Sequence, residues 1–370
     1  MKITGLSVRL LEFDPSSRYR DGRIPPGRPK TWRFPLVTVR TDEGLEGYSM
    51  AYGPHGDGPA LADMLRQVYE PLIVGEDPLR TELIWRKLAL KQRHLYNQSA
   101  SLMGVIDVAL WDLKGKILGQ PLGEIFGLCH DKLGCYASSR SEEFTAEEVF
   151  EEAGRMKRAG FHGYKLQLRA GPAKDIPRLR AAREAVGPDY PLMQDPNAAY
   201  EFDEALTVGR ELEKLSYLWY EEPIRDQQLM LLRRLQENLR VPLLVGETAR
   251  FEETHLYLND GAFCLIRADV LIKGGLTGLR KLMAAAEVFG VRVEIHTANT
   301  PLLDVAQLHA ACAHAGSRLI ENHHPIFRFG IKDNPLEPDA SGYVYPPRGP
   351  GLGVELDWDW IENHSTAASG

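Results

Sequence analysis

The sequence predicts an α/β fold, in which an N-terminal α+β capping domain precedes a (β/α)8-type barrel of modified, (β/α)7β-like form. Two observations carry this prediction. Short apolar segments that end in an acidic residue recur evenly, since Asp195, Glu221 and Glu247 follow one another at intervals of 26 residues. That interval suits one strand, one helix and two loops. Strand and helix patterns also alternate from about residue 134 onward.

The segment before the barrel has the pattern of a small α+β domain. Residues 36–41 alternate between apolar and polar side chains as a strand does, and residues 42–44 form an Asp-Glu-Gly turn. From about residue 60 the pattern is helical. Within 101–118 the apolar residues fall on one stripe, and Gly119 follows as a helix stop. We expect this capping domain to span residues 1–127.

The TIM-type barrel is expected within residues 128–325. A capping-box sequence at 145–148 predicts the start of its first helix, and Gly160 predicts the end. Eight segments are predicted strands, at 135–138, 163–168, 191–195, 218–221, 242–247, 267–272, 291–296 and 317–321. Helices are predicted within 178–187, 276–289 and 301–315. The tail, 326–370, is rich in Pro and Gly, and we expect it to pack back on the capping domain.

Composition excludes several classes of protein. The 370-residue chain has a net charge of −7 and a pI near 5.9, which argues against nucleic-acid binding. It has no run of about 18 apolar residues that would predict a membrane span, and its N-terminus lacks the apolar core of a signal peptide. The four cysteines match no zinc motif. We therefore expect a cytoplasmic protein that binds neither nucleic acid nor membranes.

The three evenly spaced acids predict a metal site. In barrels of this type the active site lies at the C-terminal ends of the strands, so Asp195, Glu221 and Glu247 should point into one site. Carboxylate oxygens are hard ligands that suit a divalent cation such as Mg2+. One acid at a strand end could equally be an exposed loop residue, but three in register favour metal ligands.

Other strand ends add polar side chains at the same height. Lys165 and Gln167 lie two apart on the second strand and should face the same side. Asp269, His296 and Glu321 belong to the last three strands. A carboxylate beside an imidazole can accept its N–H, fix its tautomer and raise its basicity. Asp269 and His296 are therefore a candidate general base.

Five motifs give the chain a family resemblance. Their order and spacing resemble the mandelate racemase/muconate lactonizing enzyme subgroup of the enolase superfamily, and the resemblance covers essentially the whole chain. The motifs are Ile-Asp-Val-Ala-Leu-Trp-Asp-Leu-Lys-Gly-Lys at 106–116, Trp-Tyr-Glu-Glu-Pro at 219–223, Gly-Glu-Thr at 246–248, Lys-Gly-Gly-Leu-Thr-Gly at 273–278 and Pro-Gly-Leu-Gly-Val-Glu at 350–355.

The resemblance implies roles for the strand-end residues. It implies Mg2+ as cofactor, with Mn2+ as a substitute, bound by the three evenly spaced acids. It implies His296 and Asp269 as the general base that removes the proton α to a substrate carboxylate, giving an enediolate. It implies Glu321 as a hydrogen-bond partner of the substrate carboxylate; a protonated Glu321 or the ammonium group of Lys165 could donate that bond. It also implies a homo-oligomer, a dimer or an octamer.

The second strand departs from the subgroup pattern and thereby favours one reaction. Many relatives carry Lys-x-Lys there and use the second Lys as a base on the opposite substrate face. Gln167 takes that position here and cannot accept a proton, so racemisation with two bases is disfavoured. One base suits β-elimination, in which His296 removes the α proton and the β-hydroxyl leaves. We therefore expect a dehydratase that converts a small-molecule sugar acid into a 2-keto-3-deoxy acid.

Two other functions remain open at this stage. A cycloisomerase or epimerase of a sugar acid would use Lys165 or Lys273 as acid or second base. A non-catalytic paralogue would bind the metal and a sugar acid without exchanging the α proton. Product analysis separates the first from a dehydratase, because elimination yields a keto acid.

The resemblance implies that two capping-domain loops, at about 13–33 and 52–59, close over the barrel, so substrate contacts are expected from them and from the barrel mouth. The first loop carries six basic and two acidic side chains, a net charge of +4. Such a cluster is either solvated surface or a grip for a distal substrate carboxylate. The second alternative predicts an aldarate as substrate in preference to an aldonate. The candidate contacts are Arg18, Tyr19, His55, Tyr164, Gln167, Asn197, Thr297 and Asn299.

Overall fold

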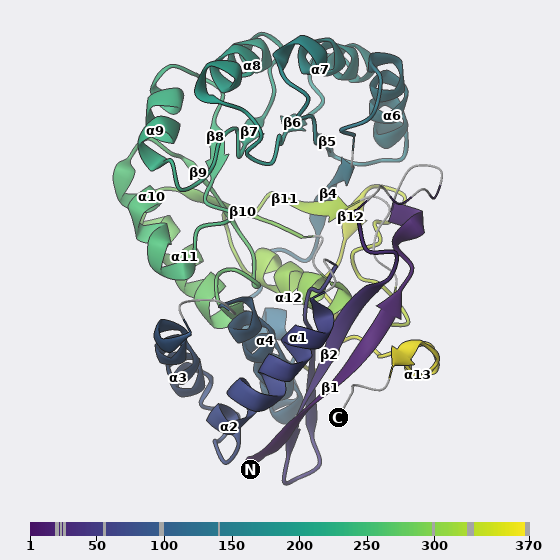
Figure 1. Cartoon of the computed structure of the whole chain (residues 1–370), viewed down its shortest axis with the longest axis vertical. Coiled ribbons are helices and arrows are strands. Elements are labelled where there is room, and N and C mark those ends of the chain that lie inside the picture. Colours follow the sequence, from purple (N-terminus) through teal and green to yellow (C-terminus); the bar gives the residue numbers. More distant parts are fainter. Residues whose placement is uncertain are drawn as a thin grey trace.

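Eight parallel strands form a nearly closed barrel (Figure 1) in the part of the chain that the structure describes. A computed structural model describes residues 1–18, 22, 24, 27–54, 57–95, 100–139, 141–297, 300–323 and 329–366. The strands are β4 (Leu133–Ser139), β5 (Gly163–Leu166), β6 (Leu192–Gln194), β7 (Trp219–Glu221), β8 (Leu243–Val245), β9 (Leu265–Ala268), β10 (Arg292–Ile295) and β11 (Leu319–His323). They neighbour one another in chain order from β4 to β10, and β11 pairs with β4. The predicted barrel is confirmed.

Helices alternate with these strands and cover the outside of the barrel (Figure 1). They are α6 (Ala146–Arg158), α7 (Pro172–Val186), α8 (Phe202–Lys214), α9 (Leu229–Glu237), α10 (Thr254–Asp260), α11 (Gly275–Phe289) and α12 (Pro301–Cys312). Helix α6 begins as predicted, because the Thr145 hydroxyl accepts from the backbone N–H of Glu148 at 3.3 Å. The Glu148 carboxylate accepts in return from the N–H of Thr145 at 2.8 Å.

The capping domain is built on an antiparallel sheet in the order β13-β1-β2-β3. Its strands are β1 (Ile3–Phe13), β2 (Trp32–Thr41), β3 (Glu46–Met50) and β13 (Ser365–Thr366). Its helices are α1 (Gly58–Met64), α2 (Glu70–Ile73), α3 (Thr81–His94), α4 (Ala100–Leu118) and α5 (Leu122–Phe126). Helix α4, predicted from its apolar stripe, is confirmed. No helix among the described residues is long and apolar enough to cross a membrane.

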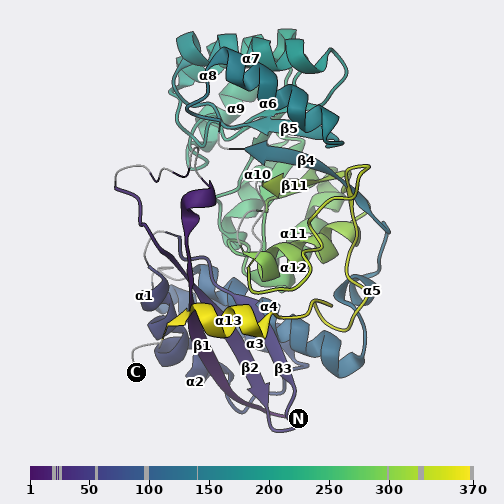
Figure 2. The same ribbon diagram turned by 90° about the vertical axis from the view of Figure 1, so that its right-hand side faces the viewer.

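The C-terminal tail touches both parts of the molecule. Its strand β12 (Tyr343–Val344) pairs with barrel strand β4, and β13 pairs with β1 of the capping sheet. Helix α13 (Trp358–His364) lies beside that sheet (Figure 2). The tail therefore connects the two sheets, while the domain limits 1–127, 128–325 and 326–370 stay predictions.

The motif at 106–116 holds the capping domain against the barrel. Buried Asp107 on α4 accepts from the backbone N–H of Thr277 at 2.8 Å and from its hydroxyl at 2.7 Å. The Trp111 indole donates to the same hydroxyl at 2.8 Å. These contacts satisfy a free N–H at the start of α11. Gly275 is required there, because its φ is +89° and a Cβ would lie 2.3 Å from the Asp107 carboxylate.

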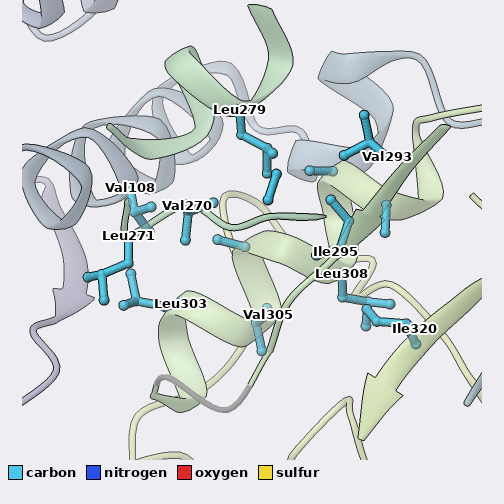
Figure 3. Packing of buried hydrophobic residues seen from close by; sticks show 14 of the residues in the cluster. Val108, Val270, Leu271, Leu279, Val293, Ile295, Leu303, Val305, Leu308 and Ile320 are labelled. Atoms are coloured by element: carbon cyan, nitrogen blue, oxygen red, sulfur yellow. The ribbon is translucent and has the colours of Figure 1, made fainter. Parts of the chain in front are cut away.

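A second acid of the motif, Asp112, joins three segments. It accepts from the backbone N–H groups of Tyr48 and Leu352, each at 2.8 Å, and pairs with Lys116 at 2.6 Å. Buried apolar side chains fill the space between α4, α11 and α12 (Figure 3). They include Val108, Leu279 and Leu303, which are buried completely. Hydrogen bonds of Asp107 and Asp112 and the packing of apolar side chains therefore hold the same interface between the capping domain and the barrel.

His309 on α12 makes a further connection between the barrel, α5 and the tail. Its Nδ1 accepts from the backbone N–H of Gly123 at 3.0 Å, and its Nε2 donates to the carbonyl oxygen of Leu352 at 3.0 Å. This arrangement requires a neutral ring. Burial lowers the pKa of His309 to about 4.

Lowering the pH should therefore reduce the stability of the protein, because His309 becomes protonated. Its folded pKa lies below the unfolded value of about 6.5, so its contribution is complete above that value and is lost as pH falls towards 4. Between pH 7.5 and pH 5 the loss should be about 2 kcal/mol. His309→Gln does not titrate, so the stability gap between wild type and variant should narrow by that amount at pH 5. Chemical denaturation at both pH values measures it, and a gap independent of pH would contradict the assignment.

Candidate active site

A layer of four charged side chains crosses the barrel interior near the C-terminal ends of the strands. It alternates in sign around the second, fourth, sixth and eighth strands, as Lys165, Glu221, Arg267 and Glu321. All four are buried. Alternate strands supply the side chains of one layer, as the geometry of such barrels requires. The layer rests on an apolar cluster of Tyr136, Met193, Trp219, Leu244, Leu265 and Leu319.

Lys165 lies among three carboxylates. Its Nζ is 3.1 Å from Oδ2 of Asp195, 3.1 Å from Oε2 of Glu221 and 2.9 Å from Oε1 of Glu321. Burial works to lower the pKa of Lys165, but these three acids outweigh burial and raise it well above its usual value. The contact with Glu221 is a hydrogen bond, and those with Asp195 and Glu321 are ion pairs. Lys165 is therefore a fixed positive charge in this arrangement.

Arg267 is the functional candidate that the sequence analysis missed. Its Nε lies 2.9 Å from Oε1 of Glu221 and 3.7 Å from Oε2 of Glu247, and its second amino group pairs with Glu321. Its first amino group donates to the Tyr136 hydroxyl at 2.8 Å. The signal was present in the sequence, because Arg267 lies two residues before Asp269 and period-two alternation puts both on one face.

Glu321 is ionised in this setting, which corrects the expectation that it could donate a proton. Burial works to raise its pKa, but Arg267 and Lys165 outweigh burial and hold the pKa well below the usual range. His323, two residues further along β11, lowers it too. Glu321 can therefore only accept hydrogen bonds, and it accepts one from the backbone N–H of Thr297 at 3.2 Å.

The structure brings His296 and Asp269 together at the ends of β10 and β9. His296 Nδ1 lies 3.1 Å from Oδ2 of Asp269, while Nε2 faces the site, 3.9 Å from Oε1 of Glu247. Burial works to lower the pKa of His296, but Glu247 and the hydrogen bond to Asp269 outweigh it and raise the pKa to about 9. With Nδ1–H donating to Asp269, Nε2 is the atom that can take up a proton.

The three predicted metal ligands lie at this end of the barrel. Asp195 follows β6, Glu221 ends β7 and Glu247 follows β8. Asn197 fixes Asp195 by donating to its Oδ1 from the backbone at 2.9 Å and from the side chain at 3.1 Å. Within the described ranges no three such side chains close around a metal position. Lys165 lies between two of these acids, Asp195 and Glu221.

Charge balance tests whether a divalent cation fits these residues. Four carboxylates, of Asp195, Glu221, Glu247 and Glu321, face the two permanent cations of the layer, so two negative charges are uncompensated. Burial raises the pKa of Glu221 to about 7. Its Oε1 has no hydrogen-bond partner among the described residues, since Arg267 approaches it at an unsuitable angle. A buried carboxylate in that state fits a metal ligand, and one divalent cation balances the cluster.

The backbone that carries Glu247 is held from two sides. Asp226 accepts from the N–H groups of Gly246 at 2.7 Å and Thr248 at 2.9 Å. Lys273 donates to the carbonyl oxygens of Gly246 at 2.7 Å, Glu247 at 3.0 Å and Ala249. The sixth strand ends at Ala268, earlier than predicted, and Lys273 lies in the following turn. Lys273 is therefore engaged with the backbone, which argues against its use as a second base.

Two predicted substrate contacts are wrong. Tyr164 is fully buried on the helix-facing side of β5, and its hydroxyl shares a 2.6 Å hydrogen bond with Ser139. Adjacent strand residues point to opposite faces, so Tyr164 cannot share the inward direction of Lys165. Thr297 is also buried, and its hydroxyl donates to the carbonyl oxygen of Glu321 at 2.9 Å. It supports Glu321 and has no free donor for a substrate.

The remaining predicted contacts are partly outside the described residues. Gln167 is half-buried beyond β5 and Asn197 is exposed beyond β6, and their contact with substrate stays a prediction. Tyr19, His55 and Asn299 fall in undescribed positions, as does the side chain of Arg18. Arg33 of the basic loop lies 2.7 Å from Glu12, so that cation already has a partner. The preference for an aldarate likewise stays a prediction.

Comparison with known proteins identifies the architecture. Residues 148–360 match the enolase C-terminal domain-like family, and residues 23–127 match the mandelate racemase/muconate lactonizing enzyme N-terminal domain. The chain belongs to the enolase superfamily. The resemblance expected from the five motifs is thereby confirmed.

Relatives within the enolase superfamily act on sugar acids. The chain is 31% identical to D-galactarolactone cycloisomerase of Agrobacterium fabrum, over 97% of each chain. It is 32% identical to arabinonate dehydratase of Saccharolobus solfataricus, over 86% of this chain and 87% of the relative. The crystal structure of D-glucarate dehydratase from Agrobacterium tumefaciens complexed with magnesium matches with a TM-score of 0.87 at 30% identity, over 98% of this chain and 99% of that one.

The support of Glu247 by Lys273 can be tested through stability. Lys273→Met leaves buried carbonyl oxygens without their charged donor, so the free energy of unfolding should fall by about 3 kcal/mol or more. Lys281→Met is the matched control, because Lys281 pairs with Glu82 on the surface, and its loss should stay within about 1 kcal/mol. Equal losses in chemical denaturation would show that Lys273 does not support this backbone.

Proposed function

We propose that this enolase-superfamily chain is a divalent-metal-dependent dehydratase of a sugar acid that forms a 2-keto-3-deoxy acid. Asp195, Glu221 and Glu247 would hold the cation, with Mg2+ as the physiological choice and Mn2+ as a substitute. Bound there, the cation would supply positive charge against the negative charge that develops on the substrate carboxylate.

His296 would carry out the proton transfer from its Nε2 atom. It takes the α proton, and the electrons of that C–H bond move onto the substrate carboxylate as an enediolate. They then form a double bond between the α and β carbons as the bond from the β carbon to its hydroxyl oxygen breaks. The newly protonated His296 can return its proton to the leaving hydroxyl, which departs as water. The enol product then tautomerises to the keto acid. Asp269 holds the ring in the required tautomer throughout.

The observation that carries the proposal is that, of the candidate basic groups His296, Lys165 and Lys273, only His296 has a nitrogen that faces the site without a hydrogen-bond partner among the described residues. The hydrogen bond from His296 to Asp269 leaves Nε2 facing the carboxylates. Lys165 lies against three acids and Lys273 against backbone carbonyl oxygens, while Gln167 is not basic. This supports removal of a proton from one substrate face, as elimination requires.

A cycloisomerase is the second candidate, because a relative with that activity matches 97% of this chain. Screening aldonates, uronates, aldarates and their lactones separates the two functions. A dehydratase converts an open-chain acid into a keto acid, which semicarbazide detects. A cycloisomerase consumes a lactone. Turnover of lactones alone would replace the dehydratase proposal with the alternative.

Activity should depend on the metal. Exhaustive chelation should abolish turnover, and Mg2+ or Mn2+ should restore it. Glu247→Gln removes one charged ligand and should lower kcat by several orders of magnitude, since the cation contributes several kcal/mol to the transition state. Full activity in the chelated wild type would exclude a metal-dependent mechanism.

The base should be identified by isotope exchange. His296→Asn should lose both dehydration and exchange of the substrate α proton with D2O, measured by NMR on the substrate found in the screen. Asp269→Asn should be severely impaired, because both the tautomer and the basicity of the ring suffer. His162→Asn is the control, since His162 precedes β5 at the opposite end of the barrel and should keep both activities. Exchange that persists in His296→Asn would place the base elsewhere.

A further inference from the structure

Arg267 is the buried cation opposite Lys165 in the charged layer. It is fully buried, and its guanidinium group approaches three acids, those of Glu221, Glu247 and Glu321. Two of these acids are proposed metal ligands. Arg267 is anchored from behind by the Tyr136 hydroxyl and by the carbonyl oxygen of Ile295, at 2.8 and 3.2 Å. It is therefore fixed in place independently of the acids that it approaches.

Electrostatics gives this position a consequence in the metal-free protein. Carboxylates brought close together in a low-dielectric interior repel one another strongly. A guanidinium group keeps its charge at any pH that a protein survives, so its compensation is permanent. Its contact with Glu221 is one of charge without a hydrogen bond, because Nε and Oε1 each have no such partner among the described residues. That acid is held in place, yet its oxygen is available to another ligand.

We propose that Arg267 is a positioning residue that keeps Glu221, Glu247 and Glu321 together before the metal binds, and that it competes with the metal for Glu221 and Glu247. This inference rests on the proposed metal dependence. It assigns the protein two properties: a fold that tolerates loss of its cation, and a metal affinity lower than three free carboxylates would give. Lys165 also compensates the charge of Glu221 and Glu321, but its ion pairs do not include Glu247.

The test compares wild type with Arg267→Met, by thermal unfolding in EDTA and in MgCl2 and by calorimetric titration with MgCl2. Wild type should unfold only slightly higher in MgCl2 than in EDTA, by the amount that binding of the cation to the folded state adds. The variant should lose about 5 °C or more in EDTA and recover most of it in MgCl2, because Mg2+ replaces the missing charge. It should also bind Mg2+ at least tenfold more tightly. Equal losses in both media with unchanged affinity would reduce Arg267 to a packing role and overturn the inference.

Two further variants keep the result interpretable. Arg292→Gln removes an arginine that pairs with Glu294 at 2.6 Å on the neighbouring strand β10, and it should bind Mg2+ like wild type. A tenfold gain there would show that the effect is not specific to Arg267. If Arg267→Met folds in neither medium, Arg267→Lys is measured instead. Lysine keeps the charge but replaces the planar fork that spans Glu221 and Glu321 with a single nitrogen. Its Mg2+ affinity should therefore still rise, and an unchanged affinity would overturn the inference.

The same titration separates this inference from the proposed function. Absence of Mg2+ and Mn2+ binding by wild type and all variants would refute the proposed metal dependence itself. Binding by wild type with no change in Arg267→Met would refute the role of Arg267 alone.

Discussion

The charged layer inside the barrel is the constraint on which the rest of the site depends. Burying Lys165, Glu221, Arg267 and Glu321 is costly for each group alone, and it is tolerable only because neighbouring strands place opposite charges in contact. Its two cations outweigh the effect of burial and hold the pKa of Glu321 well below the usual range. The layer also leaves the cluster with two uncompensated negative charges once Asp195 and Glu247 are included, and this excess favours a divalent cation.

The scaffold positions this layer and the acids beside it through contacts with the surrounding backbone. Glu247 depends on backbone held by Asp226 and Lys273, and Glu321 is supported by Thr297. At the outer wall, Asp107 fixes the start of α11, the helix that connects the strands of Arg267 and His296. The motif at 106–116 thus serves architecture, because its acids accept backbone N–H groups between the domains. Sequence motifs of one family can therefore mark either chemistry or assembly.

The sequence predicted the barrel, the main helices and the residues at the strand ends, because both periodicity and strand-end register are local properties. The sixth strand was predicted to begin at Arg267, which put this residue at the wrong end of the barrel. The strand begins at Leu265 and ends at Ala268, so Arg267 lies near its C-terminal end. Tyr164 was misplaced although period-two alternation excludes it from the face of Lys165. The partners of Lys273 and Thr297 could not be predicted, since they lie on other strands and loops and depend on the closed barrel.

Locating the cation by diffraction tests the central claim most directly. Crystals of the wild-type protein soaked in MnCl2 should give one strong anomalous peak in contact with Asp195, Glu221 and Glu247, with Lys165 turned away from the first two. Arg267 should remain bound to Tyr136 and Glu321. A peak elsewhere, or no peak at a concentration that restores activity, would contradict the account of a barrel interior whose charge is completed by a divalent cation.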